Sequence, residues 1–127
     1  MNKFTFEKKE PKLLKVEISG RVYAFNPYTL AVKKASEKFV MCQQPLVNRL
    51  KNKNLSQRDL DELVLKACTN VRDTVNAILG KNAYNQIFHG RTVDFEEHQE
   101  LMTFIFEEIA AFAKADKLSD DREPITE

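Results

Sequence analysis

Residues 57–79 carry the clearest pattern in this sequence, because their apolar side chains recur at the spacing of an α-helix. The apolar positions project within about 100° of arc at 3.6 residues per turn. They are Leu60, Val64, Ala67, Cys68, Val71, Val75, Ile78 and Leu79. Ser56 before this run suits an N-cap, and Gly80 after it suits a C-cap. The pattern predicts an amphipathic helix over residues 57–79 with one face in a core.

The flanking segments predict a β-hairpin and further helices. Residues 14–25 form two β-rich runs around Ser19-Gly20, which is typical of a hairpin. Asn26-Pro27 predicts an N-cap followed by proline at the first helical position. Pro45 is expected to kink or break the helix that follows. We expect one apolar stripe on that helix, formed near Leu30, Ala31, Ala35, Lys38, Phe39 and Cys42.

Two more helices complete the predicted architecture. Residues 81–88 predict a short helix, and a last helix is expected from about Asp94 to about Ala115. The fold class is mainly α (α+β), with a short N-terminal β-hairpin followed by a bundle of about four to five helices. We expect a flexible arm over residues 1–12, a single helical domain with its hairpin over 13–115 and a disordered tail over 116–127.

The composition is that of a soluble globular protein, with 43% hydrophobic and 31% charged residues. No run of 18 apolar residues is present, and the first residues lack the apolar core of a secretory signal. We therefore expect a cytoplasmic protein with no membrane partner. Cys42 and Cys68 match no C-x-x-C pattern and are expected to be reduced thiols in the core.

Charge is distributed unevenly along the chain. Residues 1–54 hold 12 Lys/Arg and 4 Asp/Glu, a balance of +8. Residues 55–127 hold 8 Lys/Arg and 15 Asp/Glu, a balance of −7. If the two halves occupy different faces, copies of the chain can attract one another head to tail. The alternative is that the halves fold together and their charges largely neutralise each other.

The segment "IFHGRTVDFEEHQELMTFIFEEI", residues 87–109, contains both histidines, and it raises the question of a metal or catalytic site. Neither Glu-x-x-His nor H-E-x-x-H spacing is present, so no metal site is predicted. Asp94 and Glu97 have instead the spacing of a helix N-cap pair. His98 is expected to be a packed, hydrogen-bonded histidine. No catalytic residues and no cofactor are predicted, and we expect no enzymatic activity.

The last helix has an unusually broad apolar surface. His98, Leu101 and Ile105 begin a stripe about 100° wide, and Phe104 and Phe106 broaden it to about 200° of the circumference. One neighbouring helix cannot cover that width. Either this helix is central in the fold, or part of it contacts a partner. On the second interpretation, Leu101, Phe104 and Phe106 are the expected partner-binding residues.

Residues 13–115 resemble the tail assembly chaperones of long-tailed siphophages and prophages of Gram-positive bacteria. The likeness lies in the hairpin "VEISGRVYAFNP" and most specifically in residues 79–109, with "AYNQIFHGRTVDFEEH" at their centre. The resemblance implies a non-enzymatic protein that binds the long tape measure protein, keeps it soluble and helps recruit major tail (tube) protein subunits. It also implies self-association into rings or spirals and absence from the finished virion.

Two hypotheses extend the resemblance to residues. Apolar grooves between helices suit the binding of a hydrophobic helix. Self-association is expected to pair basic residues of the first long helix with acidic residues of the last helix in another copy. The basic residues are Lys33, Lys34 and Lys38, and the acidic residues are Glu97, Glu100 and Glu108.

The alternative function is a small nucleic-acid-binding phage or prophage regulator. The basic first half supports it, including Arg49, Lys51 and Lys53. The predicted helix over 57–79, however, carries as many acids as bases on its polar face, whereas a recognition helix presents basic and groove-reading residues together. Nucleic acid is therefore the less favoured partner.

Overall fold

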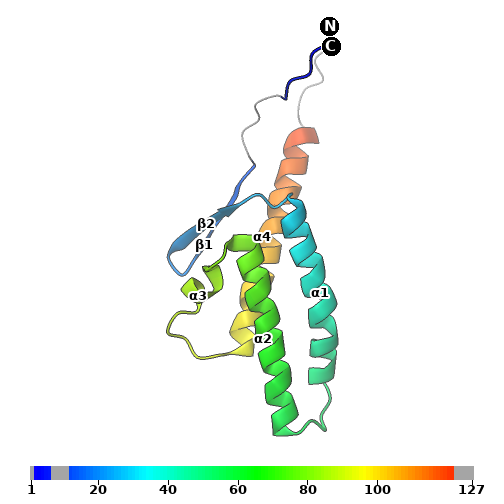
Figure 1. The fold of residues 1–127 in the computed structure, drawn as a ribbon, viewed down its shortest axis with the longest axis vertical. Helices are drawn as coiled ribbons and strands as arrows, with labels where there is room; N and C mark the ends of the chain where they lie inside the picture. The colour runs from blue at the N-terminus through cyan, green and yellow to red at the C-terminus, as the bar shows by residue number, and fades with distance from the viewer. Residues whose placement is uncertain (1, 7–11, 122–127) are drawn as a thin grey trace.

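The structure, a computed structural model, describes residues 2–6 and 12–121. Within these ranges an antiparallel hairpin of two strands precedes four helices (Figure 1). The predicted mainly α fold with an N-terminal β-hairpin is therefore confirmed. None of the described helices is both long enough and apolar enough to cross a membrane.

The hairpin consists of β1 (Leu14–Ile18) and β2 (Arg21–Phe25), which pair with Leu14 opposite Phe25. Its two-residue turn has positive φ at both positions, 51° at Ser19 and 81° at Gly20. Such φ values are typical of the type I′ turn, whose twist matches that of paired strands. One face of the hairpin is buried on the helices, through Leu14, Val16, Ile18, Tyr23 and Phe25.

Helix α1 (Leu30–Leu50) begins later than predicted. Thr29 is its N-cap and accepts a hydrogen bond from the backbone N–H of Val32, so the prediction of Asn26 as N-cap is wrong. Asn26 instead accepts from the backbone N–H of Tyr28 and forms the turn before the helix. The helix continues unbroken through Pro45, an exposed position where water can satisfy the carbonyl that proline leaves unpaired.

The buried face of α1 also differs from the predicted stripe. Leu30, Ala31, Lys38 and Cys42 are exposed. The residues that face the core are Val32, Ala35, Phe39 and Gln43. Gln43 is buried because its side-chain oxygen accepts a hydrogen bond from the Asn70 amide at 2.9 Å. A hydropathy pattern does not predict this buried glutamine. The two cysteines were both expected to lie in the core, which is correct for Cys68 but wrong for Cys42.

Helix α2 (Gln57–Leu79) has the predicted bounds and packs antiparallel against α1. The Ser56 hydroxyl accepts from the backbone N–H of Asp59, and Gly80 ends the helix with φ of 127°. Val71 and Val75 are fully enclosed. Leu63 and Thr74 are buried as well, so the core face is wider than the apolar pattern indicated.

Helices α3 (Ala83–Ile87) and α4 (Phe95–Asp121) follow. Helix α4 crosses behind α2 and the hairpin in Figure 1, and it contacts both α2 and β1. It continues to Asp121, beyond the end predicted near Ala115, because no proline or glycine interrupts residues 95–121. Residues 122–127 of the predicted tail and residues 1 and 7–11 of the predicted arm lie outside the described residues.

A polar junction joins the start of the fold to the C-terminal part of α4. The Asp116 carboxylate accepts from Lys12 Nζ at 3.0 Å and from the Tyr28 hydroxyl at 2.9 Å. The Tyr28 ring also packs against Phe112, with ring centroids 6.0 Å apart. The hydrogen bond from Lys12 and then that from Tyr28 hold the pKa of the Asp116 carboxyl below its usual value.

Replacing Asp116 tests this junction through its pH dependence. A carboxyl whose pKa is lowered by folding stabilises the fold above its unfolded pKa, and that contribution disappears as the pH falls through the folded pKa. Asp116→Ala is expected to lower the melting temperature at pH 7, and the difference from the unsubstituted chain should shrink well below about pH 4. Circular dichroism melts at both pH values measure this. Glu107→Ala is the control on the same helix, and equal melting of Asp116→Ala and the unsubstituted chain at pH 7 would contradict the junction's role.

Candidate functional site

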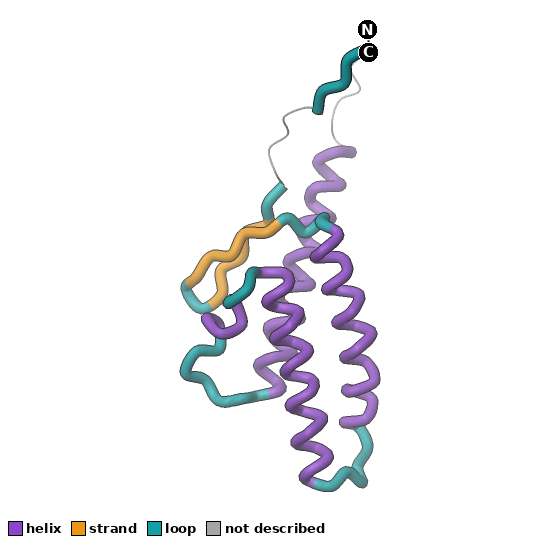
Figure 2. Tube along the Cα trace, viewed as in Figure 1, coloured by secondary structure: helices purple, strands orange, loops and turns teal. Residues whose placement is uncertain are grey.

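The segment that contains both histidines, residues 87–109, begins at the last residue of α3 and continues through a connecting loop into α4 (Figure 2). Asp94 precedes α4, and its Oδ1 accepts from the backbone N–H of Glu96 at 2.9 Å, as predicted for an N-cap. The Glu97 carboxylate pairs with Arg91 of the loop. The loop is thereby held against the first turn of α4.

His98 is a packed histidine, as predicted, with only 1% of its surface exposed. Its Nδ1 lies 2.7 Å from the Asp94 carbonyl oxygen, and its Nε2 lies 2.6 Å from the Tyr84 hydroxyl. Its ring stacks on Phe88, with centroids 4.2 Å apart. Because a carbonyl oxygen only accepts, Nδ1 donates to Asp94, and Nε2 of a neutral ring accepts from Tyr84. The histidine therefore links α3 to the beginning of α4.

The groups around His98 favour this structural role over a chemical one. Burial raises the pKa of the Tyr84 phenol, so it is a hydrogen-bond donor at neutral pH. Burial, and then the charge of Asp94, raise the pKa of the Cys68 thiol, which disfavours a reactive thiolate. No group of three or more potential metal ligands occurs among the described residues.

His98→Ala is expected to lower the free energy of unfolding by roughly 3 kcal/mol, because it opens a cavity and leaves two polar groups unpaired. Urea unfolding followed by circular dichroism measures the effect. Tyr84→Phe removes only the hydrogen-bond donor to Nε2, and it should lower the free energy of unfolding by about 1 kcal/mol. A loss below about 0.5 kcal/mol for His98→Ala, the range of surface substitutions, would be incompatible with this role.

Most of the broad apolar surface of α4 is covered within the chain. Ile105 is fully enclosed and Leu101 is only 9% exposed. On the other side, the half-buried ring of Phe106 packs against Phe39 of α1, with centroids 5.5 Å apart. Phe104 differs from these residues because 36% of its surface is exposed. Of the three predicted partner-binding residues, Phe104 is thus the most accessible.

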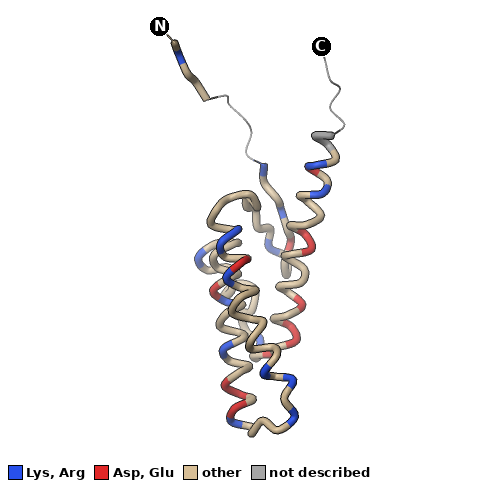
Figure 3. The backbone as a smooth tube through the Cα atoms, turned by 90° about the vertical axis from the view of Figure 1, so that its right-hand side faces the viewer, with Lys and Arg blue, Asp and Glu red and all other residues tan. Residues whose placement is uncertain are grey.

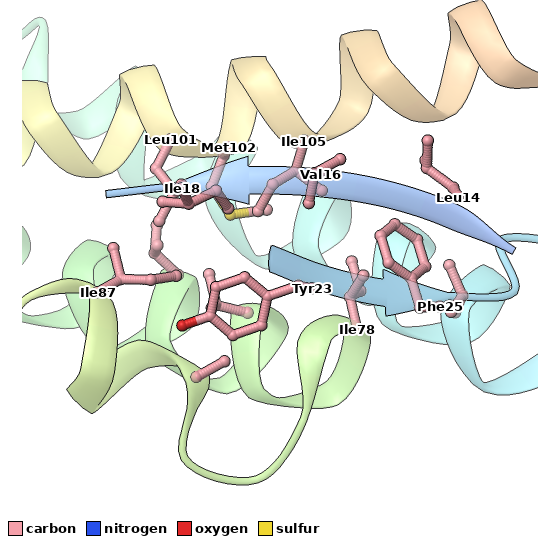
Figure 4. Packing of buried hydrophobic residues seen from close by; sticks show 14 residues of the cluster. Leu14, Val16, Ile18, Tyr23, Phe25, Ile78, Ile87, Leu101, Met102 and Ile105 are labelled. Atoms are coloured by element: carbon pink, nitrogen blue, oxygen red, sulfur yellow. The ribbon is translucent and has the colours of Figure 1, made fainter. Parts of the chain in front are cut away.

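Phe104 borders a groove of about 400 Å³ between the hairpin turn, α3 and α4. Apolar side chains from these three elements line it, namely Ile18, Ile87, Phe88, Leu101 and Phe104. In Figure 4, Ile18, Ile87 and Leu101 lie close together where β1, α3 and α4 meet. At this groove the apolar interior of the fold therefore reaches the surface.

Charged side chains surround this apolar groove. Glu17 of β1 and Glu97 and Glu100 of α4 contribute three carboxylates, whereas Arg91 contributes one guanidinium. The lining has an excess of two negative charges, and the Arg91–Glu97 pair satisfies one of the carboxylates. An apolar occupant with positive charges at its ends fits such a groove best.

The charged residues expected to join copies of the chain lie on two different helices. Lys33, Lys34 and Lys38 are exposed on α1. Figure 3 shows acidic residues along α4 and basic residues on α1 and in the loop after it. Among the described residues, one ion pair joins the basic half to the acidic half, that between Lys12 and Asp116. Direct pairing within the chain therefore leaves most of the opposed charges available.

The basic residues near the α1–α2 loop do not form a uniformly positive surface. Lys51 and Lys53 are exposed there. The first turns of α2 bring Asp59 and Asp61 to the same end of the molecule, and Glu62 pairs with Arg58. These carboxylates reduce the attraction of this end for phosphates.

Two features of the site were not predicted from the sequence. The hairpin turn contributes Ile18 and Ser19 to the groove, although they lie far from α4 in the chain. Phe4 and Phe6 are 80% and 84% exposed, the most exposed aromatic side chains described. The sequence predicted a flexible arm over residues 1–12, and no local pattern indicates what these rings contact.

Comparisons with models of protein families, with curated proteins and with solved structures found no match to this chain.

Proposed function

We propose that this chain is a phage tail assembly chaperone that binds a tape measure protein, keeps it soluble and helps recruit tail tube subunits. The proposal rests on one observation, the position in the fold of the segment that most specifically resembles the tail assembly chaperones. Residues 79–109 supply most of the lining of the groove beside Phe104. The segment that resembles the chaperones is thus also the segment that forms most of this groove.

The groove suits a helical client. A tape measure protein is a long helical chain that exposes apolar side chains before assembly, and an amphipathic helix can place such a side chain between the hairpin turn and α4. Phe104 is the proposed anchor because it is both aromatic and accessible. Leu101 also lines the groove, whereas Phe106 packs against Phe39 on the other side of α4 and does not line it.

Substitution of Phe104 tests client binding. When the chain is co-expressed with a tape measure protein, Phe104→Asp is expected to reduce the soluble, co-purifying tape measure protein by at least about tenfold, because it places a charge at an apolar anchor. The readout is the amount of client retained on the tagged chain. A second pull-down with tail tube protein tests recruitment.

Leu118→Ser is the matched control, because Leu118 is also exposed on α4 but does not line the groove. The control is expected to retain the client at the level of the unsubstituted chain. Full retention by Phe104→Asp, or an equal loss in both variants, would count against the groove as the client site. An insoluble client in the presence of the unsubstituted chain would count against the chaperone itself.

Self-association through opposed charges is part of the same proposal. Lys33, Lys34 and Lys38 of one copy are proposed to face Glu97, Glu100 or Glu108 of the next, which gives a head-to-tail contact. Rings form when the rotation between copies closes, and spirals form when it does not.

Charge reversal tests this contact. The unsubstituted chain is expected to sediment as larger species at low salt than at high salt, because exposed charges are screened by ions. Lys33→Glu combined with Lys34→Glu should reduce the larger species at low salt to the level seen at high salt. Sedimentation velocity at two salt concentrations measures both effects, and a profile that the substitutions leave unchanged would contradict the charge-based contact.

A further inference from the structure

We infer that the groove beside Phe104 receives the N-terminal arm of a second copy of this chain. The described part of the arm, residues 2–6, is extended and lies beyond the C-terminal part of α4, away from the groove (Figure 1). Phe4 and Phe6 are almost entirely exposed. Exposed aromatic pairs of this kind are unfavourable in water and typical of side chains that a partner covers.

The arm presents its two aromatic rings together. In an extended chain, residues separated by two positions point to the same face. Phe4 and Phe6 accordingly contact each other edge to face, with ring centroids 4.9 Å apart. They form one apolar unit, and a groove of about 400 Å³ lies within the range of pockets that bind small apolar groups.

Charge also matches the arm to the groove. Residues 1–11 contain three lysines and two glutamates, an excess of one positive charge, and Lys12 is already paired with Asp116. The groove lining has an excess of two negative charges, from Glu17, Glu97 and Glu100 against Arg91. Lys3 directly precedes Phe4, so insertion of the rings brings a lysine to the acidic rim. Glu17 and Glu100 are exposed on that rim and can receive it, because only Glu97 is paired with Arg91.

A second copy is the occupant that this geometry favours. The arm leaves β1 at Leu14, whereas the groove lies at the other end of the hairpin, beside Ser19. An arm that points away from its own groove can enter that of a neighbour, and the neighbour's arm is then available for the next copy. Such a contact is heterologous, since different surfaces of the two copies meet. It requires no tape measure protein.

The test uses the purified full chain alone, in sedimentation velocity over a series of concentrations at physiological salt. The unsubstituted chain is expected to associate as its concentration rises. Phe4→Ser combined with Phe6→Ser, and separately Glu17→Lys, should each raise the dissociation constant by at least about tenfold. Glu17 lines the groove and is not one of the carboxylates proposed to meet Lys33 and Lys34. Neither set of substitutions touches the core. Glu107→Lys, a charge reversal at an exposed position of α4 outside the groove, should associate like the unsubstituted chain.

Mixing the two deficient variants identifies the contact. The Phe4→Ser/Phe6→Ser chain retains an intact groove, and the Glu17→Lys chain retains an intact arm, so an equimolar mixture should associate more strongly than either variant alone. Failure of the mixture to associate, association of the double serine variant like the unsubstituted chain, or a chain that is monomeric at every concentration would each overturn the inference. The last result would indicate that the arm folds back on its own chain. None of these outcomes bears on client retention by the Phe104 variants.

Discussion

Burial of α4 from two sides is the interaction on which the rest of this structure depends. Ile105 is fully enclosed at its centre, with β1 and α3 on one flank and α1 and α2 on the other. Each flank alone would leave much of the apolar circumference in water. A two-stranded hairpin is itself marginal in water, and it gains its stability here by covering α4. The hairpin and the helices therefore stabilise one another.

The groove is a consequence of the same arrangement. The hairpin turn, α3 and α4 converge at one point, where Phe104 lies at the edge of the enclosed surface. His98 fixes α3 to the start of α4 through Tyr84 and Asp94, so the walls of the groove are rigidly placed. A preformed apolar groove of this kind binds without the loss of conformational freedom that ordering a loop would require. Both the client helix and the arm of a neighbouring copy are proposed to exploit it.

The sequence was most informative where local chemistry decides the structure. Ser19-Gly20 predicted the hairpin turn, and Ser56 and Gly80 predicted the limits of α2, because turns and caps depend on adjacent residues. The face of α1 was predicted only in part. Ala35 and Phe39 pack against the core as expected, but Gln43 is buried by virtue of Asn70 on another helix. The groove was likewise not predictable in detail, because its lining comes from three separate segments. The spacing of apolar residues predicted that a broad face of α4 must be buried, but not which elements bury it.

The hydrogen bond between the side chains of Gln43 on α1 and Asn70 on α2 limits how far the two helices can slide past each other. Apolar side chains in an interface tolerate small axial shifts, because one methyl group is much like the next. The Asn70 amide instead donates to both Gln43 and the Phe39 carbonyl, and these partners exist in one alignment only. A shift by one turn would leave the Asn70 and Gln43 amides without these partners at a partly buried position. The hydrogen bonds of Asn70 therefore favour a single alignment of α1 and α2, much as a lone asparagine fixes the register of a coiled coil.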